Sequence, residues 1–271
     1  MQKESKITSK TTNRPIAFFD SGVGGLTVYT KLKALLPEEN YIYFGDTKHM
    51  PYGEKSEAEL LEYADDILNF LCAKNVKAVV MACNTTSSVI YDKIKDKYGI
   101  KIYPIIQSAA SILAQLPVKK IGVFATPATI KSGVYKKEIQ KHNPNIEVIQ
   151  ISCPEWVRIV EEHRINQPQS ILQVKEKMDE MLSYAPDKII LGCTHYPYLT
   201  EVLTKFASKE MFIDPSVYFA EYIKNDLIKN GMTETSNAFE EIYVSAHPEN
   251  FEKSAKMFYE LKNTPQLALN D

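Results

Sequence analysis

Two cysteines of this chain stand at the ends of short apolar runs that have the length of buried strands. Cys83 follows residues 76–82, and Cys193 follows residues 188–192. Open α/β sheets place their ligand crevices at the carboxyl ends of such strands. Two thiols presented in this way could stand on opposite faces of one small polar substrate. Removing a proton from one face and returning another to the opposite face is racemisation.

Polar residues follow each cysteine directly. Asn84 and Thr85 come after the first thiol, and Thr194 and His195 come after the second. Their amide and hydroxyl groups suit substrate carboxylates, and His195 could assist the proton transfers of a nearby thiol. A helix N-terminus could lower the pKa of Cys83. A zinc site fits poorly because the spacing matches no standard arrangement, and a cysteine hydrolase would leave the second thiol unexplained.

A glycine-rich segment, Asp20-Ser21-Gly22-Val23-Gly24-Gly25, follows the first apolar run. It could be a dinucleotide-binding turn, with Asp46 as the ribose acid, in a nucleotide-binding oxidoreductase. Against this, the third glycine of that fingerprint would fall at Thr27, and a carboxylate before the turn would repel phosphates. The carboxylate of Asp20 suits instead a helper of a general base or a partner for an ammonium group. The structural alternative is a tight turn in which Asp20 caps a helix.

The composition bounds the class of protein. The 271 residues are 44% hydrophobic and 24% charged, which is ordinary for a soluble globular protein. A net charge of −2 indicates no broad attraction to nucleic acid. No apolar stretch reaches the roughly 20 residues of a membrane span, and residues 1–14 lack the apolar core of a secretory signal. Four cysteines without a C-x-x-C pair predict a cytoplasmic protein without disulfides or structural zinc.

Apolar runs alternate with amphipathic stretches along the chain, and the pattern restarts near residue 110. In the first half we expect strands at 16–19, 41–44, 76–82 and 101–106, and helices at 26–35, 56–73, 87–98 and 108–115. In the second we expect strands at 120–124, 146–151 and 188–191, with helices within 126–141 and 155–184. The late segment should add strands at 211–213 and 241–244 and helices at 217–229 and 250–261.

This alternation predicts parallel βαβ units and an α/β fold. We expect two similar doubly wound parallel-sheet halves with the site in the cleft between them, although no residue-level repeat relates the halves. The expected organisation is a flexible tail at 1–14, a first domain at 15–110 plus 213–271, and a second domain at 111–212.

Taken together, five motifs resemble glutamate racemase, a member of the aspartate/glutamate racemase family. They occur in that family's order and spacing, between about residues 15 and 260. The motifs are Phe19-Asp20-Ser21-Gly22-Val23-Gly24-Gly25-Leu26-Thr27, Gly45-Asp46-Thr47, Pro51-Tyr52-Gly53, Ala82-Cys83-Asn84-Thr85 and Gly192-Cys193-Thr194-His195-Tyr196-Pro197. Two positions, Gln107 and Arg158, depart from the family pattern.

The resemblance implies a cofactor-independent isomerase that uses two thiols to interconvert L- and D-glutamate and supplies D-glutamate for peptidoglycan synthesis and cell shape. It also implies a homodimer without a metal. The implied catalytic residues are Cys83, Cys193, Asp20, His195 and Glu161. The implied substrate-binding residues are Asp20, Ser21, Pro51, Tyr52, Gly53, Cys83, Asn84, Thr85, Thr126, Cys193, Thr194 and His195.

Three alternatives remain at this point. The first is a racemase of aspartate or another acidic amino acid. The second is an oxidoreductase that binds a nucleotide at Gly22-Val23-Gly24, and the third is a binding protein that keeps the fold without catalysis.

Overall fold

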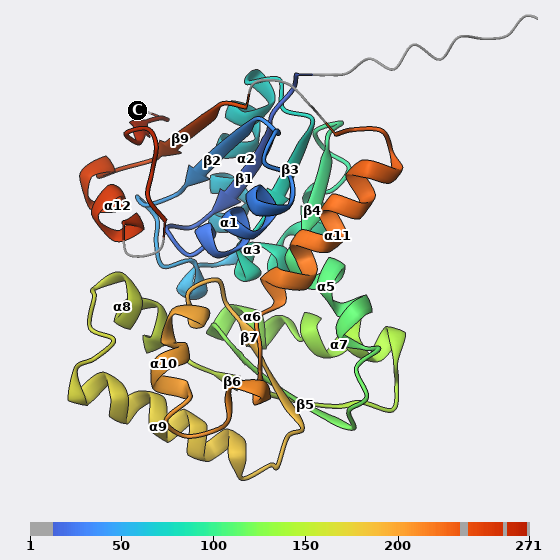
Figure 1. Ribbon diagram of the computed structural model, residues 1–271, viewed down its shortest axis with the longest axis vertical. Coiled ribbons are helices and arrows are strands. Elements are labelled where there is room, and N and C mark those ends of the chain that lie inside the picture. The colour runs from blue at the N-terminus through green and yellow to red at the C-terminus, as the bar shows by residue number, and fades with distance from the viewer. Residues whose placement is uncertain (1–12, 234–237, 257–258, 270–271) are drawn as a thin grey trace, which may run out of the picture.

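Two parallel β-sheets form the framework of the protein and lie one above the other in Figure 1. The structure is a computed structural model that describes residues 13–233, 238–256 and 259–269. The first sheet contains β1 (Ile16–Asp20), β2 (Tyr41–Gly45), β3 (Ala78–Met81), β4 (Lys101–Pro104), β9 (Glu240–Val244) and β10 (Gln266–Leu267). The second contains β5 (Lys120–Ala125), β6 (Glu147–Ser152), β7 (Lys188–Gly192) and β8 (Phe212–Ile213). Their strands pair in parallel, which confirms the predicted fold class.

Four strands of the first sheet, β2-β1-β3-β4, have the same order as the four strands of the second, β6-β5-β7-β8. The order is β10-β9-β2-β1-β3-β4 in the first sheet and β6-β5-β7-β8 in the second. The direction of winding therefore reverses between β1 and β3, and again between β5 and β7. Such switch points open a crevice at the carboxyl ends of the strands. Cys83 follows β3 and Cys193 follows β7, so each thiol stands at the switch point of its own sheet.

Helices surround both sheets (Figure 1). Around the first lie α1 (Leu26–Leu35), α2 (Glu57–Ala73), α3 (Asn84–Val89), α4 (Tyr91–Ile94), α5 (Ile105–Leu113), α11 (Pro215–Lys229) and α12 (Pro248–Ala255). Around the second lie α6 (Pro127–Ser132), α7 (Val134–His142), α8 (Glu155–Glu161), α9 (Pro168–Leu182) and α10 (Thr200–Leu203). Short 3₁₀ helices are η1 (Tyr52–Glu54), η2 (Tyr196–Leu199) and η3 (Lys209–Met211). None of the helices in the described ranges is long and apolar enough to cross a bilayer.

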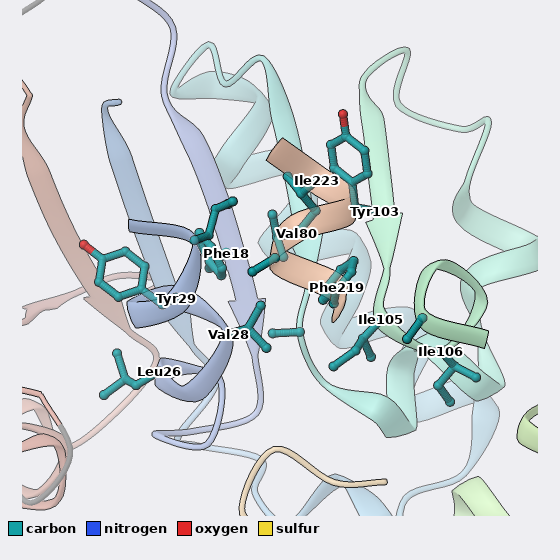
Figure 2. Packing of buried hydrophobic residues seen from close by; sticks show 14 of the residues in the cluster. Phe18, Leu26, Val28, Tyr29, Val80, Tyr103, Ile105, Ile106, Phe219 and Ile223 are labelled. Atoms are coloured by element: carbon teal, nitrogen blue, oxygen red, sulfur yellow. The ribbon is translucent and has the colours of Figure 1, made fainter. Parts of the chain in front are cut away.

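The first sheet is covered on both faces, and successive side chains of β1 point to opposite faces as strand geometry requires. Phe18 belongs to a core with α1, α5 and α11, and Figure 2 shows it with Val28, Val80 and Phe219. Phe19 belongs to a second core that packs on α2. This burial on both faces explains why the strands read as continuous apolar runs rather than alternating ones.

One apolar core joins the two halves. The cluster around Phe18 also includes Leu113 of α5, Ile139 of α7 and Ile190 of β7. The opposite face of the second sheet packs on α8 and α9 through a separate cluster that contains Trp156. The shared apolar contact between the halves therefore lies on the side of α5, α7 and α11.

Several predicted boundaries are wrong where a local residue interrupts the pattern. The predicted helix 87–98 begins at Asn84 and is interrupted at Ile90. The predicted helix 126–141 is divided at Gly133, whose φ of 66° lies in the left-handed region that favours glycine. The predicted helical region 155–184 is divided by a loop between α8 and α9.

Other differences arise from the apolar pattern itself. The predicted strand 101–106 ends at Pro104, and the next two isoleucines begin α5, because a short apolar run does not distinguish a strand from a buried helix start. The predicted helix 250–261 is the shorter α12, and β10 was not predicted. The predicted strand 211–213 is β8, which pairs with β7 of the second sheet.

Only residues 13 and 14 of the predicted tail at 1–14 are among the described residues. Residues 1–12 lie outside the described residues. Arg14 is held in place, because its guanidinium donates hydrogen bonds to the carbonyl oxygens of Asn75, at 3.0 Å, and Val76, at 2.5 Å.

Candidate active site

Both cysteines line one cavity between the two sheets. The cavity has a volume of about 10 Å³. Its lining residues are Ser21, Tyr52, Gly53, Cys83, Asn84, Thr85, Thr126, Val157, Cys193, Thr194 and His195. All of them except Val157 are among the residues predicted from the sequence. Strands that end at the two switch points thus bring residues from both halves of the chain to a single place.

The cavity is closed in this structure. A volume of about 10 Å³ is roughly that of one water molecule in the same measure. An amino acid does not fit this volume, so the residues around the cavity must move before one can enter. A site that opens for binding and closes for chemistry excludes water from the reaction.

The Cys83 side of the cavity holds its thiol protonated. Helix α3 begins at the next residue, and backbone N–H groups of Thr85 and Thr86 donate toward the sulfur, as the sequence indicated. Burial nevertheless dominates and, with the nearby carboxylate of Asp20, raises the pKa of Cys83 to about 12. The expectation that the helix N-terminus would lower this pKa is therefore wrong for the closed site, since desolvation outweighs the donors.

The Cys193 side carries a chain of three groups. The Sγ of Cys193 lies 3.7 Å from Nδ1 of His195, and Nε2 of the same ring lies 2.5 Å from Oε1 of Glu161. Burial acts to lower the pKa of His195, but its hydrogen bonds with Cys193 and Glu161 outweigh burial and hold the pKa well above its ordinary value. The imidazole therefore keeps a proton next to the thiol. Glu161, at the end of α8, borders an outer cavity rather than the central one.

Asp20 lies behind the cavity rather than on its wall. Its carboxylate is fully buried, accepts a hydrogen bond from the backbone N–H of Gly22 at 3.1 Å and accepts another from the hydroxyl of Thr194 at 3.3 Å. Burial raises the pKa of Asp20 to about 6, although the positive charge on His195 opposes the shift. The alternative in which Asp20 caps a helix is wrong, because α1 begins after Gly25 without a side-chain cap.

Asn84 presents an amide to the cavity. Its Oδ1 accepts a hydrogen bond from the hydroxyl of Tyr135 at 2.7 Å. Its Nδ2 is buried and has no hydrogen-bond partner among the described residues. A buried N–H group without a partner costs free energy until a ligand accepts its hydrogen bond. Asn84 is therefore suited to donate to a substrate carboxylate.

Two threonines join the halves at the floor of the site. Thr85 Oγ1 of the first half and Thr126 Oγ1 of the second lie 2.9 Å apart. Thr126 is the N-cap residue of α6, where its side chain accepts a hydrogen bond from the backbone N–H of Thr129. Gly53 approaches the same residue so closely that a Cβ built on it would lie 2.7 Å from the Cβ of Thr126.

Two of the predicted substrate-binding positions are placed differently. Tyr52 lines the central cavity, and its hydroxyl donates a hydrogen bond to the carboxylate of Asp46. Pro51 does not line the central cavity; it lines the outer cavity of about 460 Å³, together with Val157, Arg158 and Glu161.

The glycine-rich segment packs against the second half of the protein instead of forming a phosphate site. A Cβ on Gly24 would lie 2.5 Å from Oγ1 of Thr194 and 2.6 Å from the ring of His195. Asp46, the candidate ribose acid, is occupied by Tyr52 and by the hydroxyl of Ser245 at 2.6 Å. The space that a pyrophosphate would need is filled, which argues against the oxidoreductase alternative.

Two residues of the site were missed from the sequence. Val157 lines the cavity and stands four residues before Glu161 on α8, so helix periodicity places the two on one face and offers a signal. Tyr135, which orients Asn84, offers none, because a lone tyrosine in α7 reads as a core residue. Cys153 is fully buried in the core around Trp156 and does not line the cavity.

No group of three or more histidine, cysteine, aspartate or glutamate side chains is arranged to hold a metal ion in the part of the chain that the structure describes. The cysteines that it describes are free thiols. Cys72, on α2, is partly buried.

Known proteins resemble this chain in sequence and in fold. The model of the Asp/Glu/hydantoin racemase family matches residues 23–222. The glutamate racemase of Thermoanaerobacter sp. (strain X514) is 40% identical over 247 residues, which cover 90% of this chain and 92% of that protein. The crystal structure of glutamate racemase from Francisella tularensis subsp. tularensis SCHU S4 in complex with D-glutamate has a TM-score of 0.86 at 36% identity, covering 95% of this chain and 98% of that one. The glutamate racemase isoform RacE1 from Bacillus anthracis has a TM-score of 0.86 at 27% identity, covering 94% and 97%.

The chain belongs to the Asp/Glu/hydantoin racemase family. Within that family its relatives at about 40% identity are glutamate racemases, which confirms the resemblance drawn from the five motifs.

The close approach of Gly24 to His195 predicts the effect of one methyl group. Gly24→Ala should displace the imidazole and lower racemase activity by about a hundredfold, since small misplacements of catalytic groups are costly. Gly122→Ala is the matched control, because its Cβ would meet the flexible end of Met181, which can move aside. Both variants are assayed after thermal melting shows that they fold. Unchanged activity of Gly24→Ala would contradict the close packing.

The raised pKa of Asp20 predicts a stability that depends on pH. The folded protein binds this proton more tightly than the unfolded chain, so the stabilisation is complete below about pH 3.8 and is lost as pH rises through about 6. Asp20→Asn should therefore increase the free energy of unfolding at pH 8 by on the order of 2 kcal/mol, and by much less near pH 4. Urea denaturation of both proteins across this range measures the difference.

Asp187→Asn is the control, because it should change the free energy of unfolding at pH 8 in the opposite direction. Backbone hydrogen bonds from Lys120 and Lys119 lower the pKa of Asp187, so its contribution is present at neutral pH and is lost on acidification. This variant should be less stable than the wild type at pH 8. An Asp20→Asn protein that is less stable at pH 8 would refute the account of the buried carboxylate.

Proposed function

We propose that this chain interconverts L-glutamate and D-glutamate by proton transfer at Cα, without a cofactor. The observation that carries the proposal is that Cys83 and Cys193 line one closed cavity. The glutamate racemases among its relatives, one of them in complex with D-glutamate, support glutamate as the substrate.

In the proposed reaction, one cysteine acts as a thiolate and the other as a thiol. The thiolate takes the Cα proton, so the C–H bond breaks, an S–H bond forms and the electron pair passes into the α-carboxylate. The second thiol then donates its proton to the opposite face of Cα and becomes a thiolate. The two cysteines finish with exchanged protonation states, ready for the enantiomer just formed. Cys83 acts as base on one enantiomer and Cys193 on the other.

His195 and Glu161 serve the proton transfers of Cys193. The carboxylate of Glu161, 2.5 Å from Nε2, holds the ring so that Nδ1 faces the sulfur. In the protonated state that the raised pKa favours, the imidazolium stabilises a thiolate at Cys193.

Asp20 and the substrate ammonium group serve Cys83. The site holds two groups, Asp20 and Cys83, whose pKa values are raised by burial. A substrate brings a positive charge into this dry space, and an opposite charge nearby lowers both pKa values. The ammonium group can then form an ion pair with Asp20, and Cys83 can reach its thiolate form only while the substrate is bound.

Stabilisation of the carbanion is the largest requirement of this chemistry. The unpaired Nδ2 of Asn84 and the hydroxyls of Ser21, Thr85 and Thr194 can donate hydrogen bonds to the carboxylates as charge develops on them. The closed cavity removes water, which strengthens each of these interactions. We assign the substrate-binding role to these groups and to the backbone around Gly53.

The proposal extends to the setting of the enzyme. D-glutamate would supply peptidoglycan synthesis, and a cytoplasmic location fits the free thiols. A net charge of −2 supports a protein without a nucleic-acid partner. We also propose a homodimer of subunits in which residues 15–110 plus 213–271 and residues 111–212 act as two domains that separate to admit the substrate.

The same-class alternative is a racemase of aspartate or another acidic amino acid. It would use the same pair of thiols and differ in the space left for the side chain. Chiral chromatography of glutamate and aspartate incubated with the enzyme, without added cofactor, separates the two. Faster turnover of aspartate would favour the alternative.

Single-cysteine variants test the two-thiol mechanism. Cys83→Ser and Cys193→Ser should each lower racemisation by about 10²–10⁴-fold, because each removes one of the two proton-transfer groups. Cys72→Ser is the control, since Cys72 lies on α2 away from the cavity. The readout is chiral chromatography from both enantiomers, with circular dichroism to establish folding. A Cys83→Ser or Cys193→Ser protein that keeps wild-type turnover would refute the mechanism.

A further inference from the structure

Helix α8 lines the outer cavity, which we call the mouth of the cleft between the two halves. Three residues of α8 face different parts of the site. Val157 lines the central cavity, Glu161 contacts His195, and Arg158 lines the outer cavity. Figure 1 shows α8 on the far side of the molecule from α7 and α11, where the apolar core joins the two halves. An opening motion of the halves about that core would move α8 away from the first sheet.

One ion pair crosses this mouth. Nη2 of Arg158 lies 2.7 Å from Oε1 and 2.9 Å from Oε2 of Glu54, so the guanidinium contacts both carboxylate oxygens. Glu54 ends η1 in the first half and directly follows Gly53, which lines the cavity. Glu155, one turn earlier on α8, adds a second carboxylate 3.8 Å from Nη1. Opening the cleft must separate Arg158 from Glu54.

A second polar contact lies on the other side of the outer cavity. Nε2 of His163, just after α8, lies 3.3 Å from Oγ of Ser254 on α12. The outer cavity of about 460 Å³ is lined by residues from α8 and from α12, and both polar contacts are made by its lining residues or their neighbours. The segment from Arg158 to His163 is thus held to the first half at both ends, with Glu161 between them.

We propose that Arg158 is a positioning residue: its ion pair with Glu54 is a latch that holds α8, and with it Glu161, in the closed arrangement over His195. The latch breaks each time the cleft opens for exchange of substrate and product. It therefore sets how often the two thiols become accessible. Arg158 lines the outer cavity but touches neither the central cavity nor the reacting groups, and its effect is exerted through α8.

The expected size of the effect is modest. Arg158 and Glu54 are 42% and 47% exposed, and exposed ion pairs stabilise weakly and are screened by salt. Loss of the latch should raise the population of the open cleft by about two- to fivefold. A change of this size is measurable as a rate of chemical labelling.

The four cysteines of the chain provide the measurement and its internal references. Cys83 and Cys193 are buried in the closed cavity, so an alkylating reagent reaches them when the cleft opens. Cys72 is partly exposed on α2 and reports the intrinsic reactivity of the reagent. Cys153 is fully buried in the core of the second half and reports unfolding. Peptide mass spectrometry after timed exposure of the full chain to N-ethylmaleimide gives the four rates separately.

In the variants Arg158→Gln and Glu54→Gln, the reagent should label Cys83 and Cys193 about two- to fivefold faster than in the wild type. The labelling rates of Cys72 and Cys153 should not change. Arg164→Gln is the matched control, because Arg164 pairs with Glu162 at 2.6 Å within the second half and does not cross the cleft. It should leave all four rates as they are. The double exchange Glu54→Arg with Arg158→Glu should restore slow labelling.

The salt dependence of labelling distinguishes loss of the ion pair from loss of packing, because salt screens the ion pair only. At about 1 M NaCl, where screening acts within roughly 3 Å, the labelling of the wild type should approach that of Arg158→Gln, while the variant changes little. Unchanged labelling of Cys83 and Cys193 in both single variants, or no recovery in the double exchange with Cys153 still protected, would overturn the proposal. Faster labelling of Cys153 would show unfolding and would also count against a latch. No substrate is used, so the outcome does not depend on the proposed racemisation.

Discussion

Desolvation of the charged groups at the cleft is the constraint on which the rest of this structure depends. A Cα proton is a very weak acid, so the charge of the carbanion must be stabilised by the groups that surround it. A dry site strengthens every hydrogen bond and ion pair made to that charge. The cost of removing water appears in the charged forms of two groups, because burial raises the pKa of Asp20 to about 6 and that of Cys83 to about 12. The site is therefore built for a substrate that brings its own positive charge.

The fold meets this constraint by making the site out of two sheets with one topology. A single switch point supplies one crevice, whereas two switch points that face each other supply two thiols on opposite sides of a common space. The shared apolar core at α5, α7 and α11 holds the halves together on one side, and polar contacts meet at the other. In the opening motion that we propose, the cleft would open without exposing the core, and a cavity of about 10 Å³ could then admit a larger substrate.

Much of this could be predicted from the sequence because strand ends and turn residues carry local signals. Apolar runs followed by Cys83 and Cys193 placed each thiol correctly after the third strand of its half, and the helix predicted at 56–73 is α2, which begins with a capping box of Ser56 and Glu59. What could not be predicted depends on contacts between distant segments. The hydroxyl of Tyr52 is taken by Asp46, the amide of Asn84 is oriented by Tyr135, and the pKa of Cys83 is decided by burial rather than by the helix that follows it. No local pattern encodes any of these three facts.

The central claim is that two different groups handle the proton on the two faces of Cα, and the fate of hydrogen in deuterated water tests it most directly. L-Glutamate is incubated with the enzyme in ²H₂O, and early samples of both enantiomers are separated and analysed by mass spectrometry. Two thiols predict that the D-glutamate formed carries deuterium at Cα while the remaining L-glutamate keeps protium, with the mirror-image result from D-glutamate. D-Glutamate that retains protium, or deuterium that enters both enantiomers equally from the start, would show a single base and contradict the account.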